Sequence, residues 1–187
     1  MHYKYLEEKM DNNDILIRVR YALDIKNTDM VEIFKLGGIE LTKEEVMKLL
    51  TRSKDSYFDE AESHDETSLE TEDEHMKCNH KTLEAFFNGL IVFKRGRQEH
   101  PDQGQKPILA MKDSGSVNNV MLKKLKIALS LSSDDVMEIF ELADETIGKA
   151  ELGALFRKEG HKHYRECGDK YARRFLKGLS LKYRDDL

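Results

Sequence analysis

Apolar residues recur at helical spacing in four stretches of the first half of the chain and in four matching stretches of the second half. Between about 12 and 26, the stripe formed by Ile15, Val19, Ala22 and Leu23 has the spacing of an amphipathic helix that faces a core. The same criterion predicts further helices over about 28–36, 43–52 and 80–95. No stretch shows the alternation of apolar and polar residues that is typical of a half-buried strand. The pattern therefore indicates an all-α protein.

The second half of the chain repeats the first half. At an offset of 106, residues 13–52 align with residues 119–158 without a gap, and twelve of the forty positions are identical. At an offset of 89, residues 78–95 align with residues 167–184. Matching positions in a repeat take matching structural roles. We therefore expect two pseudo-symmetric helical repeats of about four helices each.

The change of offset from 106 to 89 marks an insertion of 17 residues in the first copy. The insertion is rich in Asp and Glu and poor in large apolar residues, which favours a solvated loop over packed structure. Proline, glycine and serine between the two copies are typical of a linker. The predicted boundaries are 1–95 for the first repeat with the acidic insertion at 54–77, 96–118 for the linker, and 119–187 for the second repeat.

Charge is unevenly distributed along the chain. The 187 residues carry a formal net charge of −5, with 31 Lys and Arg against 36 Asp and Glu. Residues 55–75 hold ten of the acids and no Lys or Arg, so the rest of the chain carries a formal charge of +5. A mildly basic body of this kind attracts anions.

Cys78 and Cys167 are the only cysteines, so the sequence contains no disulfide framework and favours a reducing compartment. The first residues lack the basic head and apolar run of a secretory signal. No stretch approaches the ~18 apolar residues that a membrane span requires. We therefore expect a cytoplasmic protein that has no membrane partner.

Several blocks of the sequence are distinctive enough to compare with known families. They include Asn12-Asn13-Asp14-Ile15-Leu16 and Asn88-Gly89-Leu90-Ile91 in the first copy, and Asn118-Asn119 and Cys167-Gly168-Asp169 in the second. These blocks resemble the YehS-like family of bacterial proteins over both copies and most of the chain. The resemblance implies a duplicated domain of unknown function, without an activity or ligand to carry over. The first copy departs from the family pattern because His80 stands where the family repeats the Asp of Cys-x-Asp.

Histidine and cysteine gather before the fourth helix of each copy, as His75, Cys78 and His80 and as His161, His163 and Cys167. Such side chains bind zinc, but their spacings match no established zinc module. Cys167 with a histidine and Asp169 could also be drawn as a nucleophilic set. The simpler interpretation is that both cysteines are buried and that Asp169, and Asn79 or His80, cap the helices that follow. We expect no cofactor and a non-enzymatic protein, with a Cys/His enzyme or metal site as the minor alternative.

Basic residues recur at several equivalent positions of the two copies. A shared positive face could bind the phosphates of RNA or DNA. Against this, if the second and third helices formed a helix-turn-helix, the third would present Glu44 and Glu45 to the phosphates. The predicted nucleic-acid-binding residues are Arg18, Arg20, Arg95, Lys123, Lys124, Lys126, His161, Arg165 and Arg173.

Aromatic residues of the fourth helices offer another possibility. Two helical halves could form a groove for a partner helix or a homodimer. The residues that could supply apolar surface are Phe86, Phe87, Phe93, Phe175 and Tyr183. We therefore predict a binding or adaptor module for protein partners, with nucleic-acid binding as the alternative.

Overall fold

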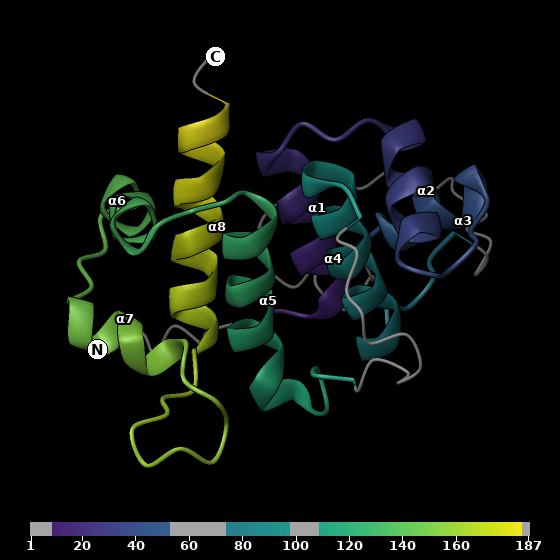
Figure 1. The fold of residues 1–187 in the computed structure, drawn as a ribbon. Helices are drawn as coiled ribbons and strands as arrows, with labels where there is room; N and C mark the ends of the chain where they lie inside the picture. The colour runs from purple at the N-terminus through teal and green to yellow at the C-terminus, as the bar shows by residue number, and fades with distance from the viewer. Residues whose placement is uncertain (1–8, 53–73, 98–108, 185–187) are drawn as a thin grey trace, which may run out of the picture.

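The structure, a computed structural model, describes residues 9–52, 74–97 and 109–184. These residues form eight helices and no strand (Figure 1). None of the helices in this part of the chain is long and apolar enough to cross a membrane. The first repeat contains α1 (Asn12–Ala22), α2 (Asn27–Leu36), α3 (Lys43–Leu49) and α4 (His80–Arg95), and the second contains α5 (Ser114–Ala128), α6 (Ser133–Leu142), α7 (Lys149–Leu155) and α8 (Asp169–Tyr183).

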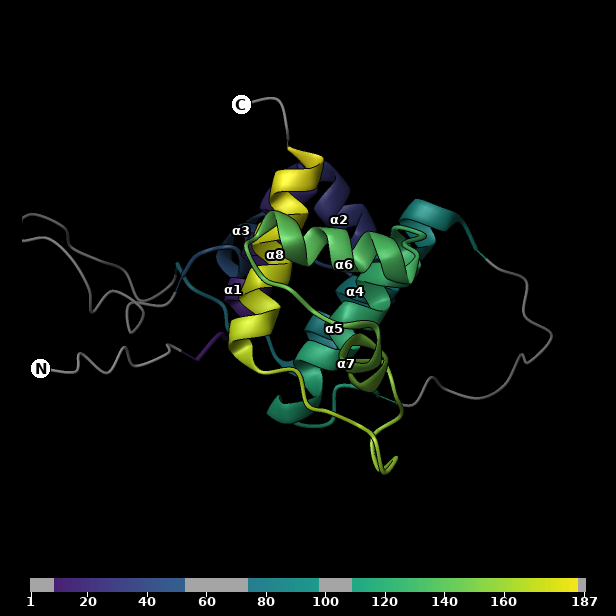
Figure 2. The same cartoon turned by 90° about the vertical axis from the view of Figure 1, so that its left-hand side faces the viewer.

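The first and fourth helices of the two repeats form the centre of the molecule. Helices α2 and α3 lie on one side of this centre, and α6 and α7 lie on the other (Figure 1). Helix α1 packs against α8, and α5 packs against α4, so each first helix packs against the fourth helix of the other repeat (Figure 2). The all-α fold of two pseudo-symmetric helical repeats is confirmed, and the repeats interlock.

Matching hydrogen bonds join the C-terminal ends of the central helices. Arg184 Nη1 donates to Tyr21 O at 3.0 Å, and Arg95 Nη1 donates to Ile127 O at 3.4 Å. Arg184 is the repeat equivalent of Arg95, and Tyr21 is the equivalent of Ile127. Each carbonyl also accepts from a backbone N–H of the turn that follows the helix, Asp24 N at 3.2 Å and Ser130 N at 3.1 Å, so each arginine adds a second hydrogen bond. The interlocking is therefore pseudo-symmetric in its details.

Buried asparagines hold each first helix to the segments around it. Asn13 Nδ2 donates to Leu49 O and Met76 O, both at 2.8 Å, and its Oδ1 accepts from Cys78 N at 2.9 Å. In the second repeat, Asn119 makes the equivalent bonds to Leu155 O, Arg165 O and Cys167 N at 2.8–2.9 Å. One side chain thus satisfies three backbone groups that are remote in sequence.

Glycines let the second and fourth helices of each repeat approach closely. A Cβ atom at Gly89 would overlap the carbonyl oxygen of Ile33 in α2, and one at Gly178 would overlap that of Ile139 in α6. A side chain at either position would therefore force the two backbones apart. Close crossings account for both mid-helix glycines.

Several predicted boundaries need correction. Helix α1 ends at Ala22 and not near 26, because Asp24 adopts a left-handed conformation with φ of 49°, and α3 ends at Leu49. Helix α5 begins at Ser114, inside the predicted linker 96–118, because Asp113 caps it by accepting from Ser116 N at 2.9 Å. Residues 54–73 of the acidic insertion lie outside the described residues.

Candidate functional site

Positive charge gathers on the surface formed by α5, α7 and the residues that flank them. A recess of about 250 Å³ is lined by Lys112, Lys123, Arg157 and Lys158. A second recess of about 600 Å³ is lined by Lys123, Lys126 and Lys149. Among the residues that the structure describes, the only acids that line these recesses are Glu159 in the first and Asp134 in the second. We call this surface the α5–α7 face and define it by Lys112, Lys123, Lys126, Lys149, Arg157 and Lys158.

Helix periodicity distributes the lysines of α5 over two sides. Lys123 and Lys126 are three residues apart and therefore project to the same side of α5, where Lys123 is exposed and Lys126 half-buried. Lys124 points to the packed side instead, toward α4. Its Nζ lies 2.5 Å from Asn88 Oδ1 and 3.7 Å from Glu84 Oε1. Lys124 is therefore a structural residue and does not belong to the α5–α7 face.

Burial lowers the pKa of Lys124, and the nearby Glu84 carboxylate opposes this shift. Glu84 is buried in turn and accepts hydrogen bonds from Ala110 N and Met111 N, at 2.9–3.1 Å. This buried pair joins α4 to α5 and to the residues that lead into α5.

An aromatic ring accompanies the charges on the α5–α7 face. Phe156 lines the second recess beside Ile127 and Leu152. The ammonium of Lys126 lies 5.9 Å from the centre of the Phe156 ring. The recess therefore combines cations with an apolar surface.

Most of the other predicted nucleic-acid-binding residues have structural partners elsewhere. Arg20 donates to Asn27 Oδ1 at 2.8 Å, and Arg95 bonds Ile127 O. Arg165 pairs with Glu151 and lies 5.3 Å from the centre of the Tyr171 ring, and His161 is exposed in the loop after α7. Of the nine predicted residues, only Lys123 and Lys126 line the α5–α7 face.

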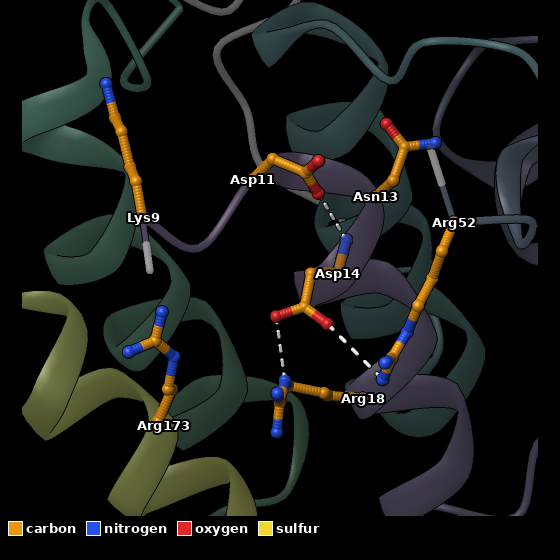
Figure 3. Close-up of a pocket in the computed structure, with 7 residues that line it drawn as sticks. All are labelled: Lys9, Asp11, Asn13, Asp14, Arg18, Arg52 and Arg173. Atoms are coloured by element: carbon orange, nitrogen blue, oxygen red, sulfur yellow. Dashed lines mark hydrogen bonds and ion pairs between the residues drawn. The ribbon is translucent and has the colours of Figure 1, made fainter. Parts of the chain in front are cut away.

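Arg18 and Arg173 line a different depression, between α1 and α8, which we call the arginine notch. Its residues are Lys9, Asp11, Asn13, Asp14, Arg18, Arg52 and Arg173 (Figure 3). The structure thus brings together two predicted residues that come from different repeats.

Four members of the α5–α7 face, namely Lys112, Lys149, Arg157 and Lys158, are absent from the predicted set. In the sequence, Glu44 and Glu45 of the third helix of the first copy argue against nucleic-acid binding. In the second copy, Ala150 replaces Glu44, and Glu151 is engaged by Arg165 and by the hydroxyl of Tyr171 at 3.2 Å. A comparison of the two third helices shows that the acidic residues that argue against binding are fewer in the second copy.

The structure does not bring the six predicted metal ligands together. His75, Cys78 and His80 line a cleft of about 800 Å³ at the N-terminal ends of the four central helices, whereas His161, His163 and Cys167 do not line it. No three His, Cys, Asp or Glu side chains of the described residues, which include all six, lie close enough to hold a metal ion. Local hydrogen bonds occupy two of these residues, because the His75 ring bonds Thr51 O at 2.8 Å and His80 bonds Asn12.

The role of His80 follows from its repeat equivalent, Asp169. Asn12 Nδ2 lies 3.0 Å from Cys78 O and 2.9 Å from His80 Nδ1. An Asn12 amide that donates one hydrogen to each of these atoms requires His80 Nδ1 to be the acceptor. In the second repeat, Asn118 Nδ2 donates to Cys167 O at 2.9 Å and to Asp169 Oδ1 at 2.8 Å. The position requires an acceptor, which histidine or aspartate can supply.

The predicted capping roles hold in part. Asn79 caps α4, since its side chain accepts from Thr82 N at 2.8 Å. Asp169 does not cap α8, whose N-cap is Gly168. The Asp169 carboxylate instead accepts from Met10 N at 2.9 Å as well as from Asn118, and so joins the second repeat to the segment before α1.

Both thiols are buried, and burial raises the pKa of Cys78 and of Cys167 to about 12. A thiol that stays protonated at neutral pH is a poor nucleophile and a poor metal ligand. These environments therefore support the interpretation of each cysteine as a small core residue.

The thiols of Cys78 and Cys167 are expected to react with a thiol reagent far more slowly in the folded chain than in the unfolded chain.

Because the folded pKa of each thiol is raised, the unfolded chain loses its thiol protons first as the pH rises. Stability is then full below about pH 9 and falls toward pH 12, by about 1 kcal/mol or more for each thiol by about pH 10.5. Urea unfolding across this range measures the fall, which should be shallower for the Cys78→Ala, Cys167→Ala double variant.

Comparison with known proteins agrees with the repeat. The model of a family described as a protein of unknown function, DUF1456, matches residues 12–96 and again residues 118–185. The uncharacterized protein YehS of Escherichia coli strain K12 is 35% identical over 174 residues, which cover 92% of this chain and 96% of that protein. No solved structure matches significantly. With two matching segments and a full-length relative, the chain belongs to the DUF1456 family of YehS-like proteins.

Proposed function

We propose that this protein is a non-enzymatic module that binds nucleic acid through the α5–α7 face. The supporting observation is the concentration of six Lys and Arg side chains around two adjoining recesses that hold only two acids. One of these acids, Asp134, already lies 3.7 Å from Lys149 Nζ. The face therefore keeps a surplus of positive charge with which to bind phosphates.

The composition of the second recess favours single-stranded nucleic acid. Unpaired bases can stack on an aromatic ring, and single-strand binding commonly combines such stacking with a basic groove. Phe156 supplies the ring, and Lys123, Lys126 and Lys149 line the same recess. A double helix would keep its bases away from this ring.

The first repeat keeps only part of this positive charge. The repeat equivalents of Lys123 and Arg157 are the neutral Ile17 and Thr51, whereas those of Lys126, Lys149 and Lys158 are Arg20, Lys43 and Arg52. Arg20 bonds Asn27, Arg52 lies 3.8 Å from Asp14, and Glu44 stands where the second copy has Ala150. Binding is therefore expected on one side of the pseudo-symmetric molecule.

The protein-partner alternative has less support among the aromatic residues that suggested it. Phe86, Phe87 and Phe175 are fully buried in the core. Only Phe93 and Tyr183 are exposed, by 39% and 42%, near the ends of α4 and α8. The charged face is thus the stronger basis for a binding function.

Reversing two charges on the face is expected to weaken binding at least tenfold. The test is fluorescence anisotropy with single-stranded RNA and DNA of about 20 nucleotides, comparing wild type with Lys123→Glu, Lys126→Glu. Each phosphate contact contributes about 0.7 to the slope of log affinity against log salt for a single strand, so the variant should lose about 1.4 from that slope.

A charge-matched control is Lys35→Glu, Lys94→Glu, which alters two exposed lysines of the first repeat. It should bind as wild type does. Equal affinities for wild type and the α5–α7 variant would refute the proposed interface. Recovery of a protein partner whose association is insensitive to salt would favour the adaptor function instead.

A further inference from the structure

We propose that the arginine notch binds a single phosphate group, held between the two repeats. The notch has a volume of about 80 Å³ and lies between α1 of the first repeat and α8 of the second. None of its residues lines the α5–α7 recesses. This site goes beyond the proposed nucleic-acid interface, and either can fail without the other.

Comparison of the two repeats shows that the notch departs from the pseudo-symmetry. The interface of α1 with α8 is equivalent to that of α5 with α4. In the latter, Lys124 pairs with the buried Glu84 at 3.7 Å. The equivalent of Lys124 is Arg18, and the equivalent of Glu84 is Arg173. A cation and an anion at one interface are thus replaced by two cations at the other.

The charges that line the notch do not balance. Its cations are Lys9, Arg18, Arg52 and Arg173, and its acids are Asp11 and Asp14. Like charges brought together in a partly buried site repel one another. Figure 3 shows the Lys9 side chain pointing away from the three arginines, so among the described residues the guanidinium groups exceed the two carboxylates by one positive charge, which equals the charge of a phosphate monoanion.

Asp14 orients two of the arginines, and within the described segments most of the remaining donors of these guanidinium groups have no hydrogen-bond partner. One of its oxygens lies 2.9 Å from Arg18 Nε, and the other lies 3.8 Å from Arg52 Nη2 (Figure 3). A guanidinium has five N–H donors in a planar fork that fits phosphate oxygens. Figure 3 shows Arg173 reaching toward the same space from α8. Three guanidinium groups from three segments thus line one notch.

Asp11 is engaged elsewhere, because its Oδ1 accepts from Asp14 N at 2.7 Å and caps α1. Its role is local, and it does not neutralise the arginines by direct pairing in the described residues. The excess charge is therefore left to a bound anion.

The size of the notch restricts what it can hold. One water requires about 10–15 Å³ of such space, so about 80 Å³ admits a group of about five heavy atoms. That is the size of a tetrahedral phosphate. Arg52 is 52% exposed on the rim, so a phosphate could also carry a larger group that extends into solvent. Inorganic phosphate and the terminal phosphate of a nucleotide share this chemistry.

Calorimetric titration of the full chain with inorganic phosphate, at constant ionic strength set with chloride, tests the proposal. Wild type should bind one phosphate per chain. Arg173→Glu introduces at this interface the charge that Glu84 has at the other, so it should fold and should weaken phosphate binding at least tenfold. Arg173→Ala removes the charge without reversing it and should weaken binding as well. Lys35→Glu is the charge-matched control and should bind as wild type.

A second titration with a 5′-phosphorylated and a 5′-hydroxyl dinucleotide distinguishes the sources. Tighter binding of the phosphorylated form than of inorganic phosphate assigns the notch to a nucleotide end, and equal binding assigns it to free phosphate. No heat with inorganic phosphate or with the phosphorylated dinucleotide would overturn the proposal. Unchanged affinity in both Arg173 variants would overturn it equally.

Discussion

Replacing Gly178 with alanine is expected to lower the free energy of unfolding by about 3 kcal/mol or more, or to prevent folding. The added methyl group would overlap the carbonyl oxygen of Ile139, which belongs to the backbone of α6. A backbone atom cannot rotate away as a side chain can, so α6 and α8 would have to separate. Urea unfolding followed by circular dichroism measures the loss.

Two further alanine variants serve as controls. Gly89→Ala should have a similar cost, because its methyl group would overlap the carbonyl oxygen of Ile33. Gly153→Ala should be neutral or stabilising by up to about 1 kcal/mol, since Gly153 lies in α7 with nothing near its Cβ position and alanine favours helix. A Gly178→Ala protein as stable as wild type would contradict the close crossing.

The second large effect is expected from Asn119→Leu, which should lower the free energy of unfolding by about 3 kcal/mol or more. Leucine has nearly the same size but leaves three backbone groups without their side-chain partner: Leu155 O, Arg165 O and Cys167 N. Each unsatisfied buried group costs about 1–3 kcal/mol. Chemical denaturation measures the change.

Asn88→Leu is the matched control, because the half-buried Asn88 makes one side-chain hydrogen bond, to Lys124, among the described residues. Its cost should stay below about 1 kcal/mol, as Lys124 keeps Glu84 as a partner. Equal losses in the two variants would show that Asn119 has no special role in the fold.

The helices could be predicted from the sequence because their signals are local. The predicted helix over 80–95 coincides with α4, and the capping box of Thr42 and Glu45 is present at α3. Because the chain is a repeat, each helix predicted in one copy also predicts its equivalent in the other copy. The partner of each helix could not be predicted, because an apolar stripe shows that a face is buried but not which helix covers it.

The candidate sites depend on contacts between residues far apart in the sequence, so only part of them was predictable. Lys123, Lys124 and Lys126 look alike in the sequence, yet Lys124 pairs with the buried Glu84 and does not belong to the α5–α7 face. Asn13 and Asn119 had a usable signal, since both repeats keep a polar residue among the core positions of the first helix. The signal reveals a buried amide but not its three partners.

Each first helix packs against the fourth helix of the other repeat, and this arrangement indicates how such a chain could arise. One repeat alone would leave the stripe of its first helix uncovered, and a second identical copy would cover it in a symmetric homodimer. The present chain is therefore equivalent to both subunits of such a dimer joined in one polypeptide. Once the subunits are joined, a substitution in one is no longer copied into the other. Descendants of a dimer can then carry a glutamate at one interface and an arginine at its counterpart, which identical subunits could never do.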